Sequence, residues 1–224
     1  MDIPPIIRVT LQASIIGAVS NILAQFITAQ QNNTPLIINW VPVFQFFLFA
    51  LFSTPPNFLW QEFMEQTFPS THPAPTNDAI AAAAANDEKA LDTSPALVEP
   101  KLNIRNTVIK TLLDQTVGAA VNTAMYSMFM HPIQAAMAHH APGHGFLTSR
   151  KGSGRVVDYG AVDWRRAVAA SRAEFWPLVK ASWAFWPFVS VLNFAVIKDV
   201  PTRSLVGNLA GVAWGVYMSL FAAQ

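Results

Sequence analysis

The sequence contains no cysteine and unusually few charged residues. The lack of cysteine excludes disulfides, iron–sulfur clusters, thiolate zinc sites and cysteine nucleophiles. Charged residues make up 12% of the 224 residues and hydrophobic residues 52%. Soluble domains carry about twice that charged fraction, because a water-exposed surface needs charges. The composition therefore indicates an integral membrane protein, and the net charge of +1 gives no basic surface for nucleic acid.

A targeting segment is also missing from the start of the sequence. Residues 1–5 contain neither the basic region and cleavage site of a secretory signal nor an arginine-rich presequence. We therefore expect any organelle-targeting signal to be internal.

Long hydrophobic runs, in contrast, occupy most of the sequence. An apolar helix of about 20 residues crosses a hydrocarbon core of roughly 30 Å. The candidate membrane-embedded segments are residues 6–28, 40–64, 107–137, 175–197 and 205–222. We predict an all-α fold in which residues 1–224 form a single polytopic membrane helix bundle with four to five membrane-embedded helices.

Prolines and arginines modify this pattern at three places. Pro55 and Pro56 are expected to kink the second segment or to mark where it turns outward. Pro177 and Pro187 suggest that the fourth segment is a broken helix. Just before it, residues 163–174 are predicted to form an interfacial amphipathic helix that carries Arg165, Arg166 and Arg172.

Two polar stretches, at about 69–100 and 138–160, are predicted to be flexible loop insertions. The alternative for residues 69–100 is a recognition segment. Residues 139–175 hold six lysines and arginines and residues 69–106 hold three. An odd number of helices would place these regions on opposite faces, with residues 139–175 facing the cytosol or matrix.

We find no sequence pattern that calls for catalysis or a cofactor. The histidines at 131, 139, 140 and 144 are the one group resembling metal ligands, and we expect a solvated loop instead. Nucleophile elbows, phosphate-binding glycine loops and the zinc-protease helix motif are all missing from the sequence. We expect no metal, no cofactor and no enzyme activity. A membrane enzyme acting on lipid is a weaker reading, with Asp114 and His131 as the available titratable groups.

Uncharged polar residues inside the predicted spans are the main functional lead, because each is costly in lipid. The pore-lining or gating candidates are Asp114, Gln115, Asn122, Asn21, Gln25, Asn193 and Asn208. Such groups either form hydrogen bonds that hold neighbouring helices together or line a hydrated path. Asp114 is the foremost gate candidate. Lys110, four residues earlier, or Arg203 would be the charge partner that neutralises it.

Small residues at helical spacing predict close helix packing in lipid. Gly17 shares a face with Asn21 and Gln25, since the three are four residues apart. The helix-packing candidates are Gly17, Gly118, Gly207, Gly211 and Gly215, the last three forming a ladder on the final segment.

A set of rare residues agrees in spacing with a known family. Trp183, Trp186 and Pro187 match a Trp-x-x-Trp-Pro element. The further matches are Asn193-Phe194, Arg203, Asn208, Trp214, Tyr217 and Ser219 downstream, and Gln25, Pro55, Trp60, Lys110 and Asp114-Gln115 upstream. With these residues the sequence resembles the family of the 22-kilodalton peroxisomal membrane protein and its Mpv- and Sym-type mitochondrial relatives. It departs from the family pattern at Ser20-Asn21, Asn39, Pro42 and Ser190, among other positions.

The resemblance implies a small multi-pass protein of an organelle membrane, either the mitochondrial inner membrane or the peroxisomal membrane. It also implies a channel or permeability role for small metabolites or ions that contributes to organelle homeostasis, without enzyme chemistry. The alternative is a structural or scaffolding membrane protein that assembles through the glycine ladder. The expected partners are the lipid bilayer and a second copy of the chain.

Overall fold

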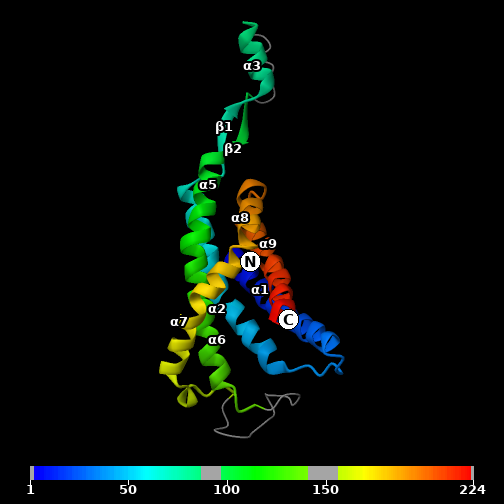
Figure 1. Cartoon of the computed structure of the whole chain (residues 1–224). Coiled ribbons are helices and arrows are strands. Elements are labelled where there is room, and N and C mark those ends of the chain that lie inside the picture. Colours follow the sequence, from blue (N-terminus) through cyan, green and yellow to red (C-terminus); the bar gives the residue numbers. More distant parts are fainter. Residues whose placement is uncertain (1–2, 87–96, 141–155, 223–224) are drawn as a thin grey trace.

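The structure, a computed structural model, describes residues 3–86, 97–140 and 156–222, with side chains as far as residue 215. Figure 1 shows an elongated helical bundle with a slender arm at one end. The helices follow the hydrophobic segments of the sequence, as expected for backbone that must satisfy its own hydrogen bonds in lipid.

The first two helices, α1 (Pro5–Gln31) and α2 (Trp40–Thr67), pack closely against each other. Asn39 caps α2 by accepting a hydrogen bond from the Val41 backbone N–H at 3.1 Å. Gly17 allows the close approach, because a Cβ there would lie 3.1 Å from the Phe46 carbonyl oxygen of α2. Pro55 and Pro56 lie inside α2, which continues past them for a further eleven residues.

The third predicted span is helical throughout but contains a π turn that the sequence pattern did not indicate. It consists of α5 (Ile104–Leu113), η1 (Asp114–Gly118) and α6 (Ala119–Ala136), and η1 is the π turn. Because a π turn carries an extra residue, it changes the register of side chains around the helix. Such turns occur often at functional sites.

The fourth predicted segment has different boundaries in the structure. Residues 163–174 do not form a separate interfacial helix, because α7 (Trp164–Ser182) runs on through Pro177. The chain then breaks before α8 (Trp186–Ala195), and the two helices are bent by 58°. The predicted break is therefore confirmed, but it lies next to Pro187. A short 3-10 turn, η2 (Tyr159–Ala161), precedes α7, and α9 (Val200–Ala222) is the last helix.

The stretch at 69–100, predicted to be a flexible loop, contains regular structure in its described part. Strands β1 (Thr71–Pro75) and β2 (Val98–Leu102) pair in antiparallel register, from Thr71 opposite Leu102 to Pro75 opposite Val98. Beyond them lies the short helix α3 (Asn77–Ala84), capped by the Thr76 side chain. These elements form the arm in Figure 1, so the fold is helical with one small two-stranded ribbon.

Among the described residues, α1 and α2 are individually long and apolar enough to cross a membrane. The bent pair α7–α8 gives a third candidate span if it crosses as one unit. The predicted count of four to five is not confirmed.

Large apolar side chains point outward over much of the bundle. Ile15 in α1 is 61% exposed and Phe188 in α8 is 77% exposed. The buried apolar cluster between α2 and α6 is small by comparison and consists of Val41, Met130, Ile133 and Met137. An apolar surface of this extent is a surface for lipid.

Candidate functional site: a polar seam between the helices

Polar side chains line the contact between α2 and the continuous helix α5–η1–α6. On α2, Asn57, Gln61 and Glu65 follow one another at four-residue intervals and so share a face. The other helices add side chains from η1, α8 and α9. We call this set the polar seam; it comprises Asn57, Trp60, Gln61, Glu65, Ser70, Lys110, Asp114, Gln115, Asn122, Ser190, Asn193, Arg203 and Asn208.

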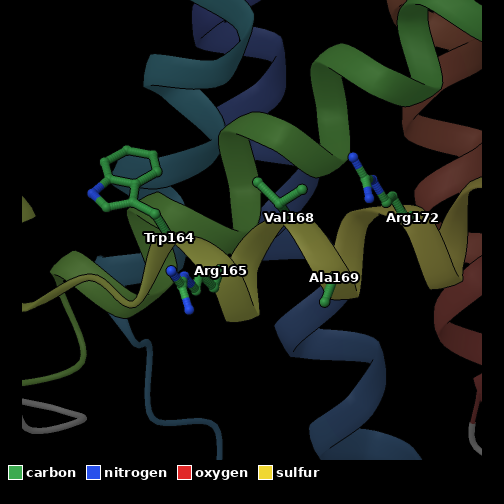
Figure 2. Close-up of a pocket in the computed structure, with 5 residues that line it drawn as sticks. All are labelled: Trp164, Arg165, Val168, Ala169 and Arg172. Carbon is green, nitrogen blue, oxygen red and sulfur yellow. The ribbon is translucent and has the colours of Figure 1, made fainter.

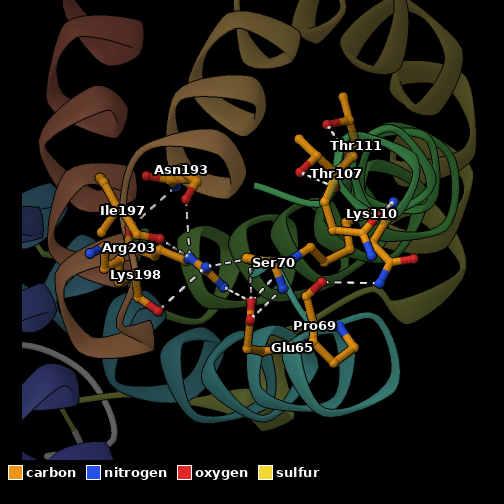
Figure 3. A network of polar contacts seen from close by, with 12 residues as sticks. Glu65, Pro69, Ser70, Thr107, Lys110, Thr111, Asn193, Ile197, Lys198 and Arg203 are labelled. Carbon is orange, nitrogen blue, oxygen red and sulfur yellow. Dashed lines mark hydrogen bonds and ion pairs between the residues drawn. The ribbon is translucent and has the colours of Figure 1, made fainter. Parts of the chain in front are cut away.

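One end of the polar seam is a buried charge cluster centred on Glu65 (Figure 3). The Lys110 ammonium lies 2.8 Å from Glu65 Oε2, and the Arg203 guanidinium also pairs with Oε2. The side chains of Lys110 and Arg203 are 0% exposed, whereas that of Glu65 is 27% exposed. Ser70 lies between them, accepting hydrogen bonds from both cations and donating to Glu65. The cluster thus joins α2, α5 and α9.

Two cations face one carboxylate here, so the cluster needs further compensation. Backbone carbonyls at the end of α8 supply part of it, because Arg203 Nε donates to the Asn193 oxygen at 3.0 Å and to the Ile197 oxygen at 2.8 Å. The ring of Phe194 also contacts both cations, with its centroid 5.0 Å from Lys110 Nζ and 5.6 Å from Arg203 Cζ.

The expected neutralisation of Asp114 by Lys110 or Arg203 is wrong. Both cations pair with Glu65 instead. The four-residue spacing itself is regular, because the Asp114 backbone N–H bonds to the Lys110 carbonyl oxygen, so the choice of partner is made by the neighbouring helices. The long Lys110 side chain reaches across to α2, where Glu65 also binds Arg203.

Asp114 has a different set of neighbours, centred on Ser190 of α8. The Ser190 hydroxyl donates to the Asp114 carboxylate, and Gln115 Nε2 donates to Ser190 Oγ at 2.8 Å. Trp183 Nε1 donates to the Gln115 carbonyl oxygen at 2.8 Å. These hydrogen bonds therefore connect the π turn to the segment where the chain breaks between α7 and α8. No charged partner of Asp114 is found in the part of the chain that the structure describes.

A third polar contact lies further along the same interface. Asn57 Nδ2 of α2 donates to Asn122 Oδ1 of α6 at 2.8 Å. Trp60 lies between this pair and Asp114. A Cβ added at Gly118 would lie 3.3 Å from the Trp60 indole nitrogen. Gly118 is thus a close-packed position, because a side chain there would press against Trp60 and Asp114.

The other pore candidates do not all join the polar seam. Gln25 donates to Asn21 at 2.8 Å and binds both the backbone N–H and the carbonyl of Asn39, at 2.7 and 2.9 Å. These bonds fasten α1 to the start of α2, away from Asp114. Asn193 and Asn208 do lie on the helices of the seam, α8 and α9.

Several buried polar atoms of the seam lack a hydrogen-bond partner. They are Gln61 Oε1, Gln115 Oε1, Asn193 Oδ1 and Asn208 Nδ2. Each such atom costs about 1–3 kcal/mol when it is left unsatisfied in a dry interior. Buried polar groups of this kind are usually completed by water.

Two hollows of the described surface lie away from the seam. One hollow lies on α7, lined by Trp164, Arg165, Val168, Ala169 and Arg172, and the other lies between α1 and α2. Neither of these hollows is lined by a seam residue.

The glycine ladder of α9 is only partly a packing face within the chain. A Cβ at Gly215 would lie 3.4 Å from Ser20 Oγ of α1. A Cβ at Gly207 or Gly211 would have no atom of a neighbouring element within 4 Å. Within one chain these two glycines therefore meet no described neighbouring helix, and their role in contacts with a second copy stays a prediction.

The histidines are dispersed in the structure. His131 pairs with Glu174 of α7 at 3.0 Å, and His140 Nε2 lies 2.8 Å from the Val156 oxygen. The His139 ring packs on His140, and His144 lies outside the described residues. Within the described residues no group of three potential metal ligands occurs.

The aromatic residues that carried the family resemblance surround the seam. Phe194 lies on the charge cluster and Trp183 binds Gln115, as described above. Trp186, at the start of α8 with Pro187, packs with Phe185 against Trp214 of α9, at ring distances of 6.5 and 5.8 Å. The side chain of Tyr217 lies outside the described part of the chain.

Five seam residues were not predicted from the sequence: Asn57, Gln61, Glu65, Ser70 and Ser190. A signal for three of them was present, since the interval of four from Asn57 to Gln61 and Glu65 is the same pattern that singled out Gly17, Asn21 and Gln25. No local pattern indicated Ser70, because it follows α2 in an irregular turn.

Ser190, Asn193 and Arg203 all come from helices in the last third of the chain. The similarity to a known protein family lies in this third. Residues 161–219 match the Mpv17 / PMP22 family. The resemblance of the sequence to this family is confirmed, and the seam is thus built from the matched residues together with α2 and α5–η1–α6.

Individual proteins of the family show how far the similarity extends. The chain is 25% identical over 230 aligned positions to Protein sym1 of Schizosaccharomyces pombe, covering 96% of this chain and 84% of that protein. It is 39% identical over 51 residues to PXMP2/4 family protein 3 of Dictyostelium discoideum, covering 23% of this chain and 27% of that protein. A segment of 50 residues is 36% identical to Protein SYM1 of Gibberella zeae, covering 28% of that protein. No solved structure matches the chain.

Proposed function

We propose that this Mpv17 / PMP22 family membrane protein provides a narrow path for small metabolites or ions across an organelle membrane, and that the polar seam is that path. The family resemblance favours the mitochondrial inner membrane or the peroxisomal membrane, with a contribution to organelle homeostasis. We further propose that the chain crosses the membrane with four to five helices and has no catalytic role.

The observation that carries this proposal is the set of unpartnered buried polar atoms on Gln61, Gln115, Asn193 and Asn208. They come from α2, η1, α8 and α9, so no single helix pair accounts for them. If these groups served only as glue between helices, each would have a partner across the interface. Atoms without partners are instead the lining of a site that water enters.

A path along the seam would be gated at the π turn. The Ser190–Asp114–Gln115 contacts close the space between η1 and α8 in this conformation. Opening would separate α8 from η1 and leave Asp114 in contact with water. Glu65, partly exposed beside two buried cations, would lie at one end of such a path.

Reconstitution of the purified protein in liposomes tests the proposal. Wild-type vesicles should show solute or ion flux above that of protein-free vesicles, and Asp114→Ala or Asn122→Leu should change it several-fold. Gln12→Leu is the matched control, because Gln12 is an exposed polar residue of α1 outside the seam. Equal conductance with and without protein would refute the proposal.

A structural or scaffolding role is the second candidate, since some seam residues do form direct pairs, such as Asn57 with Asn122. The open face at Gly207 and Gly211 would then be covered by a second copy of the chain. Gly211→Ile should in that case reduce the assembled size on a native gel while leaving flux absent throughout. An unchanged size would count against the scaffolding role.

A further inference from the structure

Helix α7 has a face that the proposed path does not use. Its buried residues Ala167, Ser171 and Val179 pack toward α6, and Glu174 on α7 pairs with His131. The remaining surface carries the hollow introduced above, which Figure 2 shows from close by.

The hollow combines two guanidinium groups with an apolar floor. Arg165 and Arg172 lie toward its two ends, and Val168 and Ala169 lie between them. Residues seven apart on a helix are separated by roughly 10 Å along its axis. Both arginines are exposed, and neither has an ion pair or hydrogen bond within the described residues.

Trp164 adds an aromatic edge to the hollow. It is 51% exposed, and the ring of Tyr159 is stacked nearly parallel to it, at 6.2 Å and 16°. Exposed tryptophans are typical of the membrane–water interface, where the ring spans apolar and polar surroundings. Trp176, further along α7, is 60% exposed.

The acidic groups near this face are engaged elsewhere. Asp163 caps α7 by accepting from the Arg166 backbone N–H at 3.0 Å, and Glu174 holds His131 at 3.0 Å. Among the described residues, the arginines of the hollow therefore face outward without a carboxylate to neutralise them.

We propose that this hollow is a binding site for an anionic phospholipid. The phosphate is held by Arg165 or Arg172 through charge-assisted hydrogen bonds, which suit the planar guanidinium. The upper part of the acyl chains lies over Val168 and Ala169, beside Trp164. Basic side chains at the membrane surface attract anionic lipids in general, and the hollow adds shape to that attraction.

Native mass spectrometry of the purified protein in a neutral detergent tests this site, with phosphatidylglycerol and phosphatidylcholine of the same acyl chains as probes. Wild-type protein should retain phosphatidylglycerol in preference to phosphatidylcholine. Arg165→Gln and Arg172→Gln should each weaken that retention by about tenfold, the loss expected for one charge-assisted contact. Circular dichroism of each variant shows that the helices remain.

The matched control is Arg166→Gln, because Arg166 is exposed on the same turn but does not line the hollow. It should retain phosphatidylglycerol as the wild type does. An equal loss in all three variants would overturn the proposal in favour of diffuse attraction. Competition by soluble glycerol 3-phosphate at equal concentration would also overturn it, since the site would then bind free phosphates rather than lipid.

Discussion

Glu65 lies near the end of α2 and supplies the negative charge that balances two buried cations. It is the carboxylate shared by Lys110 and Arg203, whose side chains are fully buried. A buried cation without a partner is strongly unfavourable, which makes the loss of one carboxylate more damaging than the loss of one surface ion pair.

Glu65→Gln should therefore destabilise the protein by about 3–5 kcal/mol, because two buried cations lose their counter-charge. Unfolding in mild detergent, followed by tryptophan fluorescence, measures the change. Glu62→Gln, less than one turn away and without an ion pair among the described residues, should stay close to wild type. A Glu65→Gln variant that unfolds like wild type would show that the cluster contributes little.

The glycines give a second prediction at the residue scale, because the structure separates positions that look alike in the sequence. Gly17→Ala places a Cβ 3.1 Å from the Phe46 carbonyl, so α1 and α2 must move apart. We expect a loss of about 1–3 kcal/mol in the free energy of unfolding. Gly207→Ala is the control and should be neutral or slightly stabilising in the isolated chain.

Among the elements, the start of α9 is held by a cap that also positions Arg203. Asp199 Oδ1 accepts the Thr202 backbone N–H at 2.8 Å, and the Arg203 N–H bonds to the Asp199 carbonyl at 3.1 Å. The hydrogen bond from Thr202 lowers the pKa of the Asp199 carboxyl below its usual value. The cap lies one turn from the charge cluster, outside the predicted spans.

Asp199→Ala should cost about 1 kcal/mol at neutral pH by removing the cap. Because the pKa of Asp199 is lower in the folded state, its ionised form stabilises folding above the unfolded pKa of about 3.9. That contribution should disappear as the pH falls through the folded pKa. Thermal unfolding of wild type and variant across pH 3–7 measures it, where the two curves should converge in acid.

Asp199→Asn is the informative control for this cap. An asparagine oxygen still accepts the Thr202 N–H but does not titrate. The Asn variant should hence remain near wild type at neutral pH and lose the acid dependence that comes from this position. An Ala variant as stable as wild type at neutral pH would contradict the assignment of Asp199 as a cap.

At the scale of the whole molecule, the helix α5–η1–α6 separates the arm from the region before α7. Figure 1 shows these two regions at opposite ends of the bundle. If α5–η1–α6 crosses the membrane, α3 and η2 lie on opposite sides. The chain has no cysteine, which makes single-cysteine labelling straightforward.

Cysteines placed at Ile80 in α3 and at Tyr159 in η2, one per variant, should react with a membrane-impermeant maleimide from opposite sides of sealed vesicles. Both positions are exposed, at 53% and 47%. Labelling of both from the same side would contradict a complete crossing by α5–η1–α6. The chain would then cross the membrane with fewer helices than the four to five that we propose.

Local sequence patterns predicted a good part of the fold, for reasons visible in particular residues. Apolar length defined α1 and α2 to within a few residues, because a helix in lipid must bury its own backbone polar groups. Pro187 marked the break before α8. The π turn at Asp114 and the ribbon at β1–β2 were not predicted, since each depends on contacts with segments distant in sequence.

The sequence by itself determined that this is a helical membrane protein, because a low charge content and long apolar runs act through transfer from water to lipid, whatever the arrangement of the helices. The spacing of rare residues also indicated the resemblance to the Mpv17 / PMP22 family. Only the tertiary structure decided which polar groups meet. It assigned Lys110 and Arg203 to Glu65, Asp114 to Ser190 and Gln25 to Asn39, because hydrogen bonds are directional and short-ranged and the partner is fixed by the position of the neighbouring helix.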